Sequence, residues 1–136
     1  MPVVPRVLLD HVEQDVAQTG KLDAGVGGNC ALAPRTAAKS PQLVGLLREM
    51  FLRNDPASYA DACRALAKAP AIRREGIGQR TLLLVGDHDR STPIAMTEEL
   101  HREIPVSLVR VIPGASHWAT LEQPDALAAA ILEFLT

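Results

Sequence analysis

The chain of 136 residues is 47% hydrophobic and 22% charged and has a formal net charge of -2, which is typical of one soluble domain with a hydrophobic core. The balanced charge and the 3% aromatic content exclude the basic, base-stacking surfaces of nucleic-acid-binding proteins, and no apolar run approaches the roughly 20 residues of a membrane-spanning helix. Because the first residues also lack the apolar core of a signal peptide, we expect a cytoplasmic protein whose partners include neither nucleic acid nor membrane.

Residues 1–78 carry apolar side chains at helical spacing. A first helix that stops at Gly20 is expected from Val7, Leu8, Val12 and Val16. The glycine-rich stretch 25–34 is expected to form a loop or a short helix. Ser40-Pro41 and Asp55-Pro56 each combine an N-cap residue with proline at the first helical position, which predicts two more helices. Their apolar faces hold Leu43, Val44, Leu47, Met50 and Phe51 in one and Tyr59, Cys63 and Leu66 in the other, which ends before Pro70.

Residues 79–136 alternate between two patterns. The continuous apolar run 81–85 and the β-branched run 108–112 predict strands that are covered on both faces. Thr92-Pro93 caps a helix that extends to Ile104. Pro124 opens a last helix, whose buried side is expected to hold Leu127, Ala130, Ile131, Phe134 and Leu135.

This order of elements is a βαβα unit, and a right-handed crossover makes its two strands parallel. The carboxyl ends of both strands then lie at one edge of the sheet, where ligands and catalytic groups gather in open α/β sheets. A sheet of two strands is marginal by itself. We therefore expect an incomplete sheet that is truncated or is completed by another chain.

Two motifs follow the two predicted strands: Gly86-Asp87-His88-Asp89 and Gly114-Ala115-Ser116-His117. A carboxylate and an imidazole at one sheet edge form the acid–base half of a nucleophilic triad, because the carboxylate orients the ring and stabilises its charged form. Asp87 is the alternative to Asp89, although a solvated turn explains Asp87 more simply. His11, His88 and His101 are interpreted as surface residues.

The nucleophile of such a triad is not evident. No Gly-x-Ser-x-Gly segment occurs in the chain, and a nucleophilic serine needs a sharp strand-to-helix turn beside backbone N–H donors. Ser116 has Gly114 two positions before it, but Trp118 stands where the second glycine would be. The other serines have no such setting, and neither do the cysteines: Ser40, Ser58, Ser91, Ser107, Cys30 and Cys63.

The segment TLLLVGDHDRSTP, residues 81–93, resembles the acid-bearing strand of α/β-hydrolases. The segment VIPGASHWATLEQP, residues 111–124, resembles the histidine loop and the start of the last helix of that family. Residues 50–66 are more loosely similar to the cap region of 3-oxoadipate enol-lactonase-like members. The resemblance implies that Asp89 is the acid and His117 the general base. The sequence departs from the family at Gln79-Arg80, where a proline is common, and in lacking the part that carries the nucleophile.

The expected fold is therefore α/β, with a helical cap-like region over residues 1–78 and the C-terminal portion of an α/β-hydrolase core over residues 79–136. The resemblance implies hydrolysis of a small carboxylic ester or lactone, with no cofactor and no metal, and Trp118 either lines the pocket or packs under the last helix. Without a nucleophile, the chain alone is expected to be inactive. The alternative is a non-catalytic remnant or interaction module of the same fold, whose bare sheet edge self-associates or pairs with a missing N-terminal portion.

Overall fold

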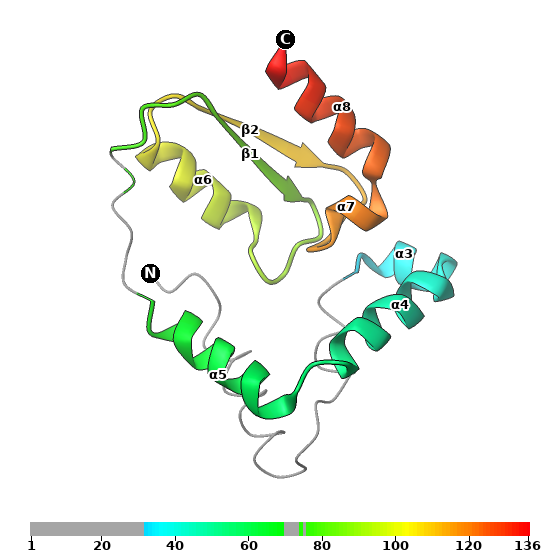
Figure 1. Cartoon of the computed structure of the whole chain (residues 1–136). Coiled ribbons are helices and arrows are strands. Elements are labelled where there is room, and N and C mark those ends of the chain that lie inside the picture. Colours follow the sequence, from blue (N-terminus) through cyan, green and yellow to red (C-terminus); the bar gives the residue numbers. More distant parts are fainter. Residues whose placement is uncertain (1–31, 70–73, 75) are drawn as a thin grey trace. The chain divides into compact units, whose positions relative to one another are not determined.

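The computed structural model describes residues 32–69, 74 and 76–136. These residues form two compact units, one from residues 40–69 and the other from residues 32–39 together with 74 and 76–136 (Figure 1). The helix expected around Val7 to Val16, its stop at Gly20 and most of the loop predicted over residues 25–34 lie outside the described residues.

The first unit is a pair of helices, α4 (Pro41–Leu52) and α5 (Pro56–Ala67), and both confirm the proline start signals. The Asp55 carboxylate accepts the backbone N–H of Ser58 at 2.9 Å and so caps α5, whereas the side chain of Ser40 makes no cap bond to α4. Phe51 and Tyr59 meet edge to face with ring centroids 5.1 Å apart. This aromatic pair connects the two helices across the turn between them.

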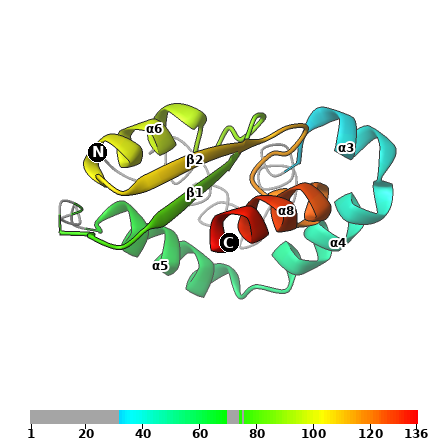
Figure 2. The ribbon, with the colours of Figure 1, turned by 90° about the horizontal axis from the view of Figure 1, so that it is seen from above.

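The second unit is built on a parallel pair of strands, β1 (Thr81–Gly86) and β2 (Ser107–Ile112), with Thr81 opposite Ser107 and Gly86 opposite Ile112. The crossover between them is α6 (Ile94–Glu103), and α8 (Pro124–Leu135) follows β2. Helices α6 and α8 lie on opposite faces of the strands (Figures 1 and 2). The predicted βαβα unit is confirmed, and its sheet is incomplete, since the described residues contribute two strands.

Arg80 connects the start of β1 to the end of α8. Its guanidinium lies over the ring of Phe134, 4.9 Å from the centroid, and donates to the Phe134 carbonyl at 3.0 Å. A cation above an aromatic face gains electrostatic attraction in addition to the hydrogen bond. The Arg80 side chain therefore joins the strand to the helix.

Helix α8 is less buried than its apolar pattern predicts. Ile131 is 37% exposed and Leu135 70% exposed, although both were expected on the buried side. The strands are also only partly covered, with Leu108 45% and Val111 40% exposed. The expectation was wrong in this respect because two strands are too narrow to cover a helix of three turns. No described helix is long and apolar enough to cross a membrane.

Two short helices were not anticipated. Helix α3 (Pro34–Lys39) begins where the predicted loop ends, and α7 (Ala119–Glu122) is a single turn that follows the histidine motif. Neither shows the periodic apolar pattern of a longer helix, because α3 has six residues and α7 four, too few for the 3.6-residue helical period to recur twice. Both lie in the second unit, and α7 directly follows the loop that carries His117.

Candidate active site

The loops that follow β1 and β2 are joined by backbone hydrogen bonds. Asp87 N–H donates to the Ile112 carbonyl at 3.2 Å, and His88 N–H donates to the Ala115 carbonyl at 2.9 Å. The Asp87 carboxylate accepts the N–H of Gly114 at 2.8 Å. The two loops therefore form one hydrogen-bonded layer above the carboxyl ends of the strands.

Two glycines allow this close approach. A Cβ atom on Gly86 would lie 2.4 Å from the carbonyl oxygen of Ala115, so a side chain there would force the two loops apart. Gly114 has a φ of +72°, in the left-handed region that glycine adopts without steric cost. Glycine is thus favoured sterically at position 86 and at position 114. Both glycines allow the two loops to approach closely enough for Asp89 to contact His117.

The structure brings Asp89 and His117 together. Asp89 Oδ2 lies 3.0 Å from Nδ1 of His117, across a sequence separation of 28 residues. The Asp89 side chain is 6% exposed and the His117 side chain is 45% exposed. A nearly buried carboxylate therefore orients a ring whose other edge is accessible, as the acid–base half of a triad requires.

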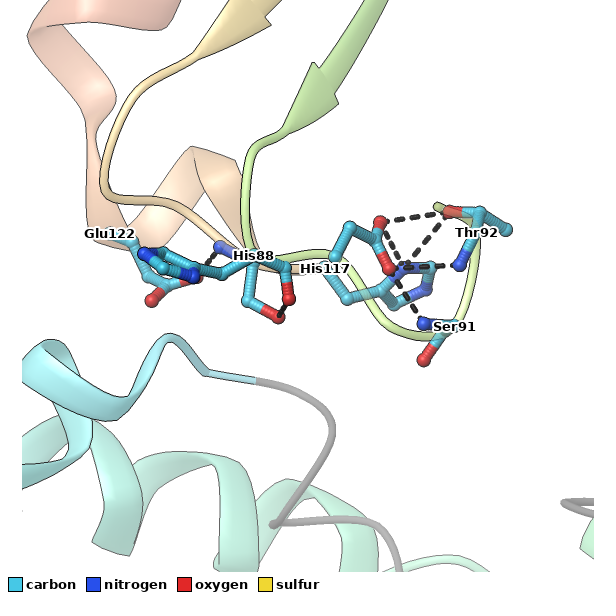
Figure 3. Close-up of polar contacts among 7 residues, drawn as sticks. His88, Ser91, Thr92, His117 and Glu122 are labelled. Carbon is cyan, nitrogen blue, oxygen red and sulfur yellow. Dashed lines mark hydrogen bonds and ion pairs between the residues drawn. The ribbon is translucent and has the colours of Figure 1, made fainter. Parts of the chain in front are cut away.

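Asp89 is held in place by the turn that follows it. Its Oδ1 accepts the backbone N–H groups of Ser91 and Thr92, each at 2.8 Å, and its Oδ2 accepts the Thr92 hydroxyl at 2.8 Å. Figure 3 shows His117 beside Ser91 and Thr92, with the Thr92 hydroxyl 3.4 Å from Nδ1. Thr92 was expected to cap the next helix, but Pro93 is the N-cap of α6 and the threonine hydroxyl binds the acid instead.

These contacts set the charge state of the acid. Burial raises the pKa of Asp89. The hydrogen bonds from the Thr92 backbone, the His117 ring and the Thr92 hydroxyl lower it, as does the charge of the imidazolium, and together they outweigh burial. The net pKa of Asp89 lies below the ordinary value for an aspartate. The carboxylate is therefore ionised at neutral pH, when it is needed to orient the ring.

The other residues that the sequence singled out, Asp87, His88 and Trp118, have surroundings that differ from those of Asp89 and His117. Asp87 binds Gly114 and lies 3.9 Å from His88, so its contacts hold the loops together rather than His117. His88 is exposed, as expected. Trp118 precedes α7 and is 36% exposed, and its contact with a substrate stays a prediction.

Two serines of this unit use their hydroxyls structurally. Ser116 is 2% exposed and its hydroxyl donates to the His88 carbonyl at 3.1 Å. The Ser107 hydroxyl donates to the Ile104 carbonyl at 2.7 Å and lies 2.8 Å from Nδ1 of His101. Both hydroxyls thus donate to backbone carbonyls of this unit, and the absence of a nucleophile among these serines stays a prediction.

Glu122 was missed by the sequence reasoning. Its two carboxylate oxygens accept the backbone N–H groups of Ala33 and Ser116, each at 2.6 Å. A carboxylate in a one-turn helix, five residues after the histidine, has no periodic signal. The local clue is an acidic residue just before Pro124, where the chain must turn.

A model of the alpha/beta hydrolase family matches residues 4–130 of the chain. Among curated proteins, 3-oxoadipate enol-lactonase 1 of Acinetobacter baylyi is 40% identical over 76 residues, which are 54% of this chain and 28% of the relative. Two solved structures are similar over nearly the whole chain. A thermophilic esterase from Thermogutta terrifontis, solved with malate bound, is 28% identical with a TM-score of 0.82.

The second solved structure is the enol-lactonase from Burkholderia xenovorans, which is 22% identical with a TM-score of 0.87 and supports the fold alone. The match covers 96% of this chain and 50% of the esterase, and 97% of this chain and 52% of the enol-lactonase. The chain thus spans about half the length of the solved structures and less than a third of the Acinetobacter relative.

Proposed function

The chain belongs to the alpha/beta hydrolase family, and from this premise we propose that Asp89 and His117 are the acid and the general base of a carboxylic ester or lactone hydrolase. The observation that carries the proposal is the 3.0 Å contact between Asp89 Oδ2 and His117 Nδ1 at the carboxyl ends of two parallel strands. The chain order, acid before histidine, is that of the family.

In this proposal Asp89 favours the tautomer of His117 that carries its proton on Nδ1. Nε2 then takes the proton of the nucleophile as that nucleophile forms a bond to the carbonyl carbon of the substrate. The imidazolium, stabilised by the Asp89 carboxylate, returns the proton to the departing alkoxide oxygen. In a second cycle water attacks the acyl carbon and gives its proton to His117. The bond between the acyl carbon and the nucleophile then breaks, His117 returns the proton to the nucleophile, and the carboxylic acid leaves.

In this proposal the nucleophile comes from outside the 136 residues, because they contain no Gly-x-Ser-x-Gly segment. We therefore include in the proposal a complementary, nucleophile-bearing N-terminal portion that pairs with this chain. The exposed apolar residues of β2 and α8 support such pairing, because large uncovered apolar surfaces mark sites of association. By itself the chain is expected to show negligible turnover of p-nitrophenyl acetate.

The substrate class rests on the relatives. An enol-lactonase and an esterase both act on acyl–oxygen bonds, so the proposed substrate is a small carboxylic ester or lactone. We retain the division into a helical cap-like region over residues 1–78 and a core portion over residues 79–136, and the contact of Trp118 with substrate, as parts of the same proposal.

A chimera tests the proposal directly. The part of the Acinetobacter enol-lactonase that precedes the matched segment is fused to this chain, to supply the nucleophile that the proposal requires, and is assayed with p-nitrophenyl acetate and an enol-lactone. We expect measurable hydrolysis that falls by about 10⁶-fold in His117→Ala and by about 10⁴-fold in Asp89→Asn, because Asp89 acts only through His117. His88→Ala is the matched control and retains activity. A folded chimera whose hydrolysis does not depend on His117 would contradict the proposal.

The second candidate function is a non-catalytic interaction module, which the exposed apolar surface also favours. The coding sequence that adjoins this one distinguishes the two candidate functions. A Gly-x-Ser-x-Gly segment in the same or a neighbouring frame supports the enzyme. A partner that binds the chain equally well when His117 and Asp89 are replaced supports the module.

A further inference from the structure

Glu122, the last residue of α7, connects two segments that are distant in the sequence. Its Oε1 accepts the N–H of Ala33, 89 positions away, and its Oε2 accepts the N–H of Ser116, the residue before His117. Figure 3 shows Glu122 below the loop that carries the histidine. One carboxylate therefore joins the segment that leads into α3 to the backbone of the histidine motif.

Both backbone donors are buried. Ala33 is 1% exposed and Ser116 is 2% exposed, so water cannot replace Glu122 as the acceptor of their N–H groups. Hydrogen bonds to an ionised acceptor are shorter and stronger than neutral ones, in agreement with the 2.6 Å distances of both contacts. The backbone at position 116 is thus fixed by the strongest kind of hydrogen bond available to it.

The ring of His117, by contrast, has little packing to hold it. It is 45% exposed, and the contacts that orient it are Asp89 at 3.0 Å and Thr92 at 3.4 Å. Its position therefore depends on where the backbone places its Cα atom. A displacement of about 1 Å is enough to lose catalytic geometry.

We infer that Glu122 is a positioning residue for His117. By binding Ser116 it fixes the backbone from which the ring reaches Asp89, and by binding Ala33 it makes that position depend on the segment before α3. Glu122 does not contact the ring, so it acts through the backbone and not as a catalytic residue. The inference rests on the proposed function, because it presumes that Asp89 and His117 work as a pair.

Nuclear magnetic resonance of the full chain at neutral pH tests this inference. The signals to follow are the backbone amides of Ala33 and Ser116 and the ring nitrogens of His117, whose chemical shifts report the tautomer. Glu122→Gln keeps the size of the side chain but replaces one acceptor oxygen with an NH₂ group. Glu133→Gln is the matched control, because Glu133 pairs with Arg110 on the exposed side of α8.

In Glu122→Gln we expect both amide signals to move upfield and the tautomer of His117 to shift from Nδ1–H toward Nε2–H. Glu122→Asp keeps the charge on a shorter side chain, so it is expected to restore part of both signals. Glu133→Gln changes neither. If Glu122→Gln does not fold, Glu122→Asp decides, because its shorter reach must still displace the Ser116 amide and the His117 ring signals.

Unchanged ring signals in a folded variant with a displaced Ser116 amide would overturn the inference and leave Glu122 a purely structural role. Asp89→Asn in the same experiment separates this failure from that of the proposed function. If Asp89→Asn alters the ring signals and the Glu122 variants do not, the positioning role is wrong and the acid–base pair stands. If Asp89→Asn also leaves them unchanged, the pair itself is wrong.

Discussion

Within the second unit, the two loops that follow β1 and β2 have their polar contacts completed, whereas the sheet and α8 leave apolar side chains exposed. In the loops Asp87 and Asp89, and in the adjoining α7 Glu122, accept hydrogen bonds from backbone N–H groups. On the sheet and α8, apolar side chains such as Leu108 and Leu132 remain 45% and 64% exposed. Polar contacts among near neighbours can be completed within a part of a fold, whereas an apolar core needs layers that this sheet does not contain.

This contrast predicts that substitutions in the loops are costly and that substitutions on α8 are not. The largest effect is expected from Gly86→Ala, whose Cβ would lie 2.4 Å from the Ala115 carbonyl oxygen. The loops must separate, at a cost of about 2–3 kcal/mol in the free energy of unfolding. Gly78→Ala is the control, since a Cβ there meets nothing within 4 Å. Urea denaturation measures the free energy of unfolding of both variants. Equal values for Gly86→Ala and Gly78→Ala would contradict the predicted steric clash.

A smaller effect is expected from Thr92→Val, which removes the hydroxyl that donates to Asp89 Oδ2 at 2.8 Å. The loss is about 1.5 kcal/mol, at the low end for hydrogen bonds to charged groups because the site is partly exposed. Thr92→Ser retains the hydroxyl and should recover most of the stability. Thermal unfolding of both variants is the measurement, and a valine variant as stable as the serine variant would contradict this role.

Acid should weaken the loops through Asp89. Its pKa in the folded state lies below its unfolded value of about 3.9, so the folded state binds this proton less readily. The stabilisation is fully present above about pH 3.9 and is lost as the pH falls through the folded pKa. Asp89→Asn should therefore lose less stability than the wild type on acidification, in urea titrations below pH 5.

The smallest effect is expected on α8. Leu135 is 70% exposed, so Leu135→Gln should change the free energy of unfolding of the chain by less than about 0.5 kcal/mol. The same substitution should weaken association with a complementary N-terminal portion, which would bury this face. A large loss of stability in the chain alone would show that the α8 face is already covered.

The sequence was sufficient for the features that depend on short-range patterns. Apolar runs and proline start signals located β1, β2, α6 and α8, and the motifs around Asp89 and His117 placed both side chains at one sheet edge. Each of these signals is contained in fewer than about 15 residues, the range over which periodicity is informative.

The missed features depend on long-range contacts. The bond from Ala33 to Glu122 spans 89 positions, and no local pattern at either residue announces it. Thr92 looked like a cap because threonine before proline often is one, but the nearby carboxylate of Asp89 competes for its hydroxyl. The exposure of Leu135 was misjudged because an amphipathic pattern shows which side seeks burial and not whether the covering layer is present.

In the proposed site Asp89, rather than Asp87, orients the ring of His117. The most direct measurement is the ring nitrogen spectrum of His117 in the wild type, in Asp89→Asn and in Asp87→Asn. We expect a ring protonated on Nδ1 in the wild type and in Asp87→Asn, and a shift toward the Nε2–H tautomer in Asp89→Asn alone. An Nε2–H ring in the wild type, or a tautomer that follows Asp87 instead of Asp89, would contradict it.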